Sequence, residues 1–138
     1  MTDSAGGELL WLAAGVFGLL ALLAAGFVWY KGRPVAGGRV FRASRLSRGN
    51  FWLPTQVSVA PTAIVHYTPE LFGGREHSMH ISHVASVLID RNLFFSDVLI
   101  ESTGGASPVR CHGHRKRDAV EMKRLIEQYQ SEYLSRAR

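Results

Sequence analysis

The residues best suited to chemistry are the six histidines and the single cysteine, Cys111. His77, His80 and His83 recur at intervals of three residues. Imidazole and thiolate groups are common zinc ligands, and a structural zinc site needs about four of them to converge. Successive side chains of a strand point to opposite faces, so His80 faces away from His77 and His83. We therefore expect solvated histidines and no bound metal, and a histidine-based metal-binding domain is a minor alternative.

The sequence also lacks the motifs that accompany enzymatic catalysis. No Gly-x-Ser-x-Gly elbow, His-Glu-x-x-His pair or phosphate-binding loop is present. Cys111 would need a base beside it to act as a nucleophile, but in an alternating strand it faces away from His112 and His114. We expect Cys111 to be a small core residue of a protein that is not an enzyme and uses no cofactor. A single cysteine also fits a reducing compartment.

The element most clearly indicated is an uncharged apolar segment over residues 9–30. A helix of this length spans about 33 Å, which matches the hydrocarbon core of a bilayer. Trp11 lies at one end and Trp29 and Tyr30 at the other, as in the aromatic belts of membrane proteins. The preceding tail, residues 1–8, carries two acids and no Lys or Arg, unlike a cleaved signal peptide. We expect an uncleaved transmembrane helix.

Small residues recur along one face of this helix at spacings of four, three and four. They are Ala14, Gly18, Ala21 and Ala25. Small side chains let membrane helices approach closely, so this face predicts packing against another helix. The alternative is that Ala and Gly are merely common in the segment.

Residues 31–50 are basic and are interrupted by glycine and proline, so we expect a linker. Positively charged flanks stay in the cytoplasm, which places the N-terminus outside and the remaining chain inside. Each Lys or Arg near a membrane attracts anionic headgroups by about 1 kcal/mol. The residues expected at the lipid surface are Trp11, Trp29, Tyr30, Lys31, Arg33, Arg39, Arg42, Arg45 and Arg48.

The rest of the chain, residues 51–138, suits one small domain. Its charge is nearly balanced, so the net charge of +5 comes mostly from the linker. A nucleic-acid-binding domain would need a basic face with matching aromatic residues, which is not seen. Alternating runs predict about six short antiparallel strands. These runs cover residues 56–59, 63–68, 75–82, 84–90, 94–102 and 108–114, with turns at 60–62 and at Gly73 and Gly74.

The final segment, residues 118–134, has the apolar stripe of an amphipathic helix. Asp118 is expected to cap its first turn, with Glu121 completing a capping box. Two features before this helix are candidate docking groups. Adjacent Phe94 and Phe95 face opposite sides of a strand, which exposes one aromatic ring, and a basic run precedes the helix. The basic run is Arg115, Lys116 and Arg117.

Short strands followed by one closing helix are the order of a pleckstrin-homology-like (PH-like) barrel. The runs VSVAPTAIVHYT, REHSMHISHVASVLID, LFFSDVLIES, PVRCHGH and DAVEMKRLIEQY resemble those of small bacterial PH-like domains beside transmembrane segments. The resemblance covers Thr55 to Tyr133. It implies a mainly-β barrel of six or seven antiparallel strands closed by a C-terminal helix. It also implies a non-enzymatic module that binds lipids, proteins or copies of itself.

Eukaryotic PH domains bind phosphoinositides through basic residues in the loop between their first two strands. We expect the corresponding loop here to be Ala60-Pro61-Thr62, which carries no charge. The sequence therefore favours a single-pass protein of the bacterial inner membrane that docks as an accessory subunit on a larger membrane complex. A respiratory or photosynthetic complex would suit, but no residue selects either, and self-association is equally open. A sensor of anionic lipid is the alternative.

Overall fold

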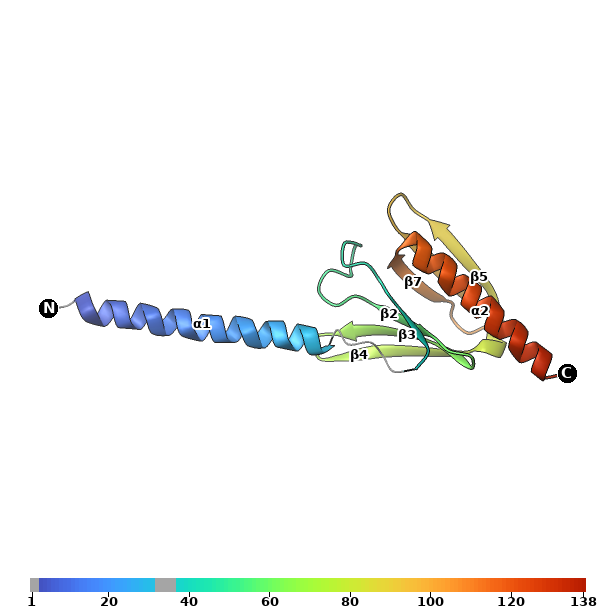
Figure 1. Ribbon diagram of the computed structural model, residues 1–138, viewed down its shortest axis with the longest axis horizontal. Helices are drawn as coiled ribbons and strands as arrows, with labels where there is room; N and C mark the ends of the chain where they lie inside the picture. The colour runs from blue at the N-terminus through green and yellow to red at the C-terminus, as the bar shows by residue number, and fades with distance from the viewer. Residues whose placement is uncertain (1–2, 32–36) are drawn as a thin grey trace. The chain divides into compact units, whose positions relative to one another are not determined.

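The computed structural model describes residues 3–31 and 37–138, which belong to two compact units, Met1–Arg33 and Pro34–Arg138 (Figure 1). The first unit holds one helix, α1 (Asp3–Lys31). Its segment Gly6–Tyr30 is long and apolar enough to cross a membrane, a property that signal sequences share. No side chain described in this segment is buried. Trp11 and Trp29 lie about 27 Å apart along the axis, close to a hydrocarbon thickness.

The second unit contains two antiparallel sheets and a helix. The first sheet has the order β1 (Arg39–Arg42), β2 (Gln56–Val59), β3 (Ala63–Glu70) and β4 (Gly73–His80). A 3-10 turn, η1 (Ile81–His83), leads to the second sheet. That sheet has the order β5 (Val84–Arg91), β6 (Ser96–Ser102) and β7 (Val109–His114). The chain ends in α2 (Lys116–Arg136).

The two sheets are not closed into the barrel that we expected. Within residues 37–138, no ladder of strand pairing joins them. One backbone hydrogen bond of 2.8 Å, from the Ser44 N–H to the Gly113 carbonyl, joins the residues after β1 to β7. Because β1 has only four residues and ends before Ser44, it offers no further backbone groups to β7. The architecture is therefore an apolar helix, sheets of four and three strands, and a C-terminal helix.

The core of the second unit lies between the sheets and under α2. Ala119, Met122 and Ile126 are fully buried at the spacing predicted from the sequence. They face a cluster from both sheets, and α2 packs against β5, η1, β6 and β2 (Figure 1). Cys111 is part of this core, and burial raises the pKa of its thiol to about 12. A thiol in that state is not a nucleophile at neutral pH.

The segment expected to be a linker contains a strand. β1 pairs antiparallel with β2, and Phe41 on β1 is buried in the core. The loop between the first two strands is thus residues 43–55, which contains Arg45 and Arg48, and not the uncharged 60–62 turn. The strand was missed because a run of four residues is too short for an alternating pattern to stand out in the sequence.

Two local expectations about turns and caps were wrong. α2 begins at Lys116, and its N-cap is Arg115 with no side-chain hydrogen bond. Asp118 lies inside the first turn, while Glu121 pairs with Arg39 instead of completing a capping box. The β3–β4 turn is formed by Leu71 and Phe72, because β4 already starts at Gly73.

A bulge at Gly113 redirects the end of β7. Ser96 pairs with His114 and Val98 with Cys111, so β7 holds one extra residue there. Gly113 has φ +74°, which breaks the alternation and turns His114 into the core, away from the exposed face of His112. The expectation that His114 is solvated was therefore wrong.

We predict that Gly113→Ala destabilises the second unit more than Gly105→Ala. Both glycines have positive φ, but a Cβ at Gly113 would also overlap the Ser47 side chain, whereas nothing lies near one at Gly105. We expect Gly105→Ala to lower the free energy of unfolding by about 1 kcal/mol and Gly113→Ala by about 3 kcal/mol. Urea unfolding of the full chain in detergent, followed by circular dichroism, measures both. Equal losses would show that Ser47 yields freely.

Candidate functional site

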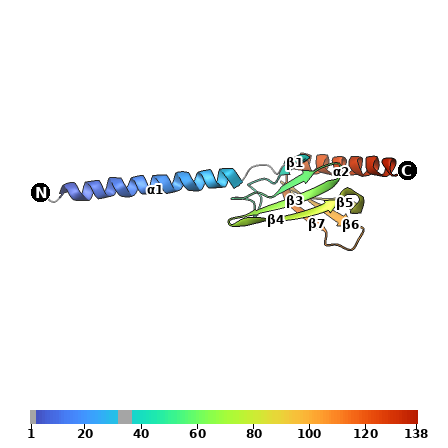
Figure 2. The same ribbon diagram turned by 90° about the horizontal axis from the view of Figure 1, so that it is seen from below.

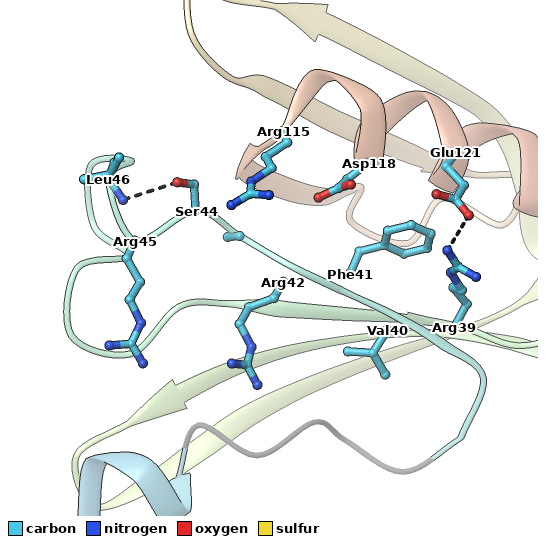
Figure 3. A pocket seen from close by; sticks show the side chains of 11 residues that line it. Arg39, Val40, Phe41, Arg42, Ser44, Arg45, Leu46, Arg115, Asp118 and Glu121 are labelled. Atoms are coloured by element: carbon cyan, nitrogen blue, oxygen red, sulfur yellow. Dashed lines mark hydrogen bonds and ion pairs between the residues drawn. The ribbon is translucent and has the colours of Figure 1, made fainter. Parts of the chain in front are cut away.

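A basic groove lies between β1, the loop that follows it and the start of α2 (Figure 3). Its volume is about 510 Å³. β1 and α2 lie side by side along it, as Figure 2 also shows. We define the groove by its charged residues, which are Arg39, Arg42, Arg45, Arg115, Asp118 and Glu121. Four of them are cations that the sequence alone had placed in two unrelated segments.

The cations of the groove do not have equal environments. Arg39 forms an ion pair of 2.7 Å with Glu121. Both side chains are partly exposed, so this pair contributes at most about 1 kcal/mol. Arg115 extends from the start of α2 toward the chain around Ser44, and Arg42 and Arg45 point away from α2 (Figure 3). The groove therefore exposes positive charge on two sides of a partly neutralised centre.

The other basic residues predicted from the sequence lie elsewhere. Lys116 and Arg117 line a separate surface pocket of about 660 Å³ with Arg91 and Arg124. Arg124 lies two helical turns after Arg117, a spacing that could have been read from the sequence. Arg48 lines pockets beyond the groove. Arg33 lies outside the described residues, and Lys31 is the last residue of α1.

Large apolar side chains are exposed on three segments that connect strands. We call residues 43–55, Leu71-Phe72 and 92–95 the loop end. Strand register puts the β1–β2 and β3–β4 connections together, and one pocket is lined from both 47–48 and 92–95. The exposed members are Leu46, Phe51, Trp52, Leu71, Phe72, Leu93 and Phe94. Phe72 is fully exposed, and Phe94 is 76% exposed, whereas Phe95 is half-buried.

The histidines divide into exposed and buried groups. His77, His80 and His83 are exposed, and within residues 3–31 and 37–138 no three His, Cys, Asp or Glu side chains are placed to hold a metal ion. His114 is fully buried with neither ring nitrogen hydrogen-bonded in the described chain. Burial lowers its pKa to about 4, and nearby His66 adds to the effect. His114 is therefore neutral at pH 7.

Asp97 links β6 to the bulge in β7. It accepts a hydrogen bond of 2.8 Å from the Gly113 N–H and lies 3.1 Å from Nδ1 of His112. Burial alone would raise the pKa of Asp97, but these contacts outweigh it and lower the pKa. The carboxylate is thus ionised at neutral pH and fixes the ring of His112.

The comparisons with known proteins identify no family for this chain. No protein-family model matches it, and no curated protein matches it.

We predict that His114→Leu leaves stability at pH 8 unchanged or raised, because the buried ring makes no hydrogen bond to the described residues that the substitution would remove. The unfolded chain protonates this histidine near pH 6.5, whereas the folded chain does so near pH 4. Stability is therefore fully present above pH 6.5 and falls as the pH drops toward 4, by up to about 3 kcal/mol.

His114→Leu should remove most of this acid-dependent loss, and the half-buried His66 should retain a smaller part. The matched control is His83→Gln at an exposed position, which should leave the pH dependence intact. Urea unfolding at pH 8, 6 and 4.5 measures the effect. A large destabilisation of His114→Leu at pH 8 would show that the ring has a polar partner.

Proposed function

We propose that this protein is a non-enzymatic, single-span membrane protein whose second unit is an interaction module for a membrane protein partner. The observation that carries this proposal is the loop end, where seven large apolar side chains are exposed on three connecting segments. Exposed apolar groups gathered in this way typically mark interaction surfaces. The loop end also contains Arg45 and Arg48. Aromatic residues and arginine are both enriched at protein interfaces.

The anchor is α1. Its length and the tryptophans near its two ends support a membrane span. The basic residues after it support an N-terminus outside and the second unit in the cytoplasm of a bacterial cell. Along α1, Ala14, Gly18, Ala21 and Ala25 share one face, which suits packing against a helix of the partner.

The order of elements in the second unit supports its likeness to the PH-like family. Strands precede a single C-terminal helix that covers the core, as the resemblance implies. The open edge between the sheets is where this chain departs from a closed barrel. Membership of that family remains part of the proposal. It agrees with a binding role, because the family carries no catalytic machinery.

Contact with anionic lipid is the second candidate, and the composition of the β1–β2 loop favours it. Arg45 and Arg48 are exposed in the same loop as exposed Phe51 and Trp52. Aromatic side chains favour the headgroup region, and arginine attracts its phosphates. Such a loop would read the charge of the membrane on which the protein is anchored.

The docking proposal predicts a specific cross-link at the loop end. A photo-reactive residue in place of Phe94 should give an adduct of discrete mass in native membranes, and one in place of Leu134, which is exposed near the end of α2, should not. Leu93→Ser with Phe94→Ser should abolish co-purification of that partner in mild detergent. The chain should also stay in the membrane fraction after a wash at alkaline pH, because α1 anchors it. Recovery of only uncross-linked monomer at both positions would contradict docking.

The lipid candidate predicts that deuterium uptake by residues 43–55 is slower in anionic than in neutral nanodiscs. The difference should largely disappear on raising salt from 0.1 to 1 M, because the screening length falls from about 10 to about 3 Å. Arg45→Gln with Arg48→Gln should reduce the difference, whereas Arg136→Gln, on the last turn of α2, should not. Equal deuterium uptake by residues 43–55 in anionic and neutral nanodiscs would contradict contact with anionic lipid.

A further inference from the structure

A pocket of about 280 Å³, lined mostly by residues with polar side chains, lies between β3 and β7, beside the loop that joins β1 to β2. Its lining differs in charge from that of the basic groove, because Asp118 and Glu121 line the groove and no carboxylate lines this pocket. The lining residues include two arginines, two histidines, two threonines and an asparagine. Its residues are Arg48, Gly49, Asn50, Thr55, His66, Thr68, Arg110 and His112.

The two arginines of this pocket have no partner of their own. Within the described part of the chain, neither the Arg48 nor the Arg110 guanidinium group forms a hydrogen bond or an ion pair. Two unpaired cations that line one small pocket repel each other, and an anion placed between them removes that repulsion. A guanidinium presents a planar fork of donors that matches the oxygens of phosphate.

His66 adds an unsatisfied group to the same pocket. It projects from β3, and its Nε2 is buried with no hydrogen-bond partner among the described residues. Burial lowers the pKa of His66, and the rings of His77 on β4 and His112 on β7 lower it further. A buried ring nitrogen without a partner is the exception in folded proteins and marks a place where a ligand can supply one.

The pocket is built on a fixed scaffold. Asn50 is buried and donates to Ser47 Oγ at 2.8 Å and to the His112 carbonyl at 3.4 Å. Its own Oδ1 accepts from the Thr55 N–H at 3.1 Å. These bonds hold the loop that carries Arg48 against β7, which carries Arg110. Asp97 on β6 also fixes the ring of His112 through Nδ1.

We propose that this pocket binds an oxyanion of the phosphate class between Arg48 and Arg110, with His66 as an additional donor. A water molecule occupies about 30 Å³ of liquid, so the pocket holds a tetrahedral anion and a few waters but no drug-sized ligand. The ligand is a phosphomonoester group or free phosphate. This inference goes beyond docking at the loop end, and either one can hold without the other.

The test uses the full chain in a maltoside detergent, with inorganic phosphate as the probe. We expect saturable binding by calorimetry and a phosphate-dependent shift of the His66 ring resonances, because an adjacent anion stabilises the protonated ring. Arg48→Gln and Arg110→Gln should each weaken binding about tenfold or more. Both side chains are exposed, so these variants should fold normally.

The matched control is Arg91→Gln, which removes the same charge from an exposed residue that does not line the pocket. It should change the affinity by less than about twofold, as expected for a charge outside the site. The proposal is overturned if the unmodified chain shows no saturable binding up to about 20 mM phosphate, far above a millimolar Kd. It is equally overturned if Arg91→Gln weakens binding as much as Arg110→Gln.

Nanodiscs distinguish the two sources of the ligand. If a lipid headgroup is the ligand, discs with phosphatidic acid should shift the His66 resonances without added phosphate, and phosphatidylcholine discs should not. If free phosphate is the ligand, the resonances should shift in both kinds of disc, and only when phosphate is added. A shift in neither condition contradicts the proposal, whatever the outcome of cross-linking at Phe94.

Discussion

The second unit depends on the burial of one helix face between sheets that do not close on each other. Met122 and Ile126 of α2 are fully buried, and each contributes about 1.5–3 kcal/mol by leaving water. With no strand ladder across the gap in the described chain, this face supplies the apolar contact that holds β2, η1, β5 and β6 to a common core. The packing of α2 is therefore a condition for the rest of the unit.

Fixing α2 also fixes where charge is displayed. Its first residues follow β7 directly, so Arg115 must lie beside the end of the strand, and β1 then brings Arg39 and its neighbours alongside. The bulge at Gly113 serves the same junction, because its carbonyl accepts the Ser44 N–H and its amide reaches Asp97. One short segment thus positions the loop, the groove and the start of the helix together.

The spacing of residues along the chain predicted the elements that are determined by neighbouring residues. The alternation of β2 and β3, the intervening turn and the buried stripe of α2 were all readable from residue spacing. β1 was not, since four residues gain their strand conformation only from pairing with β2. Burial of His114 depends on one glycine conformation, and the pocket joins Arg48 to Arg110 from distant parts of the sequence. Contacts between distant residues produce no periodic pattern in the sequence, so they could not be predicted from it.

The basic groove and the pocket between β3 and β7 differ more in the position of their acidic residues than in their number of arginines. In the groove, Glu121 already pairs with Arg39 and Asp118 lies beside it, so an incoming anion must compete with carboxylates of the chain itself. In the pocket between β3 and β7, the nearby acid Asp97 is turned to His112 and to the bulge. The arginines there are left for a ligand. Mixed charges suit the groove to broad electrostatic contact, whereas two arginines beside the buried Nε2 of His66 suit the smaller pocket to one small anion.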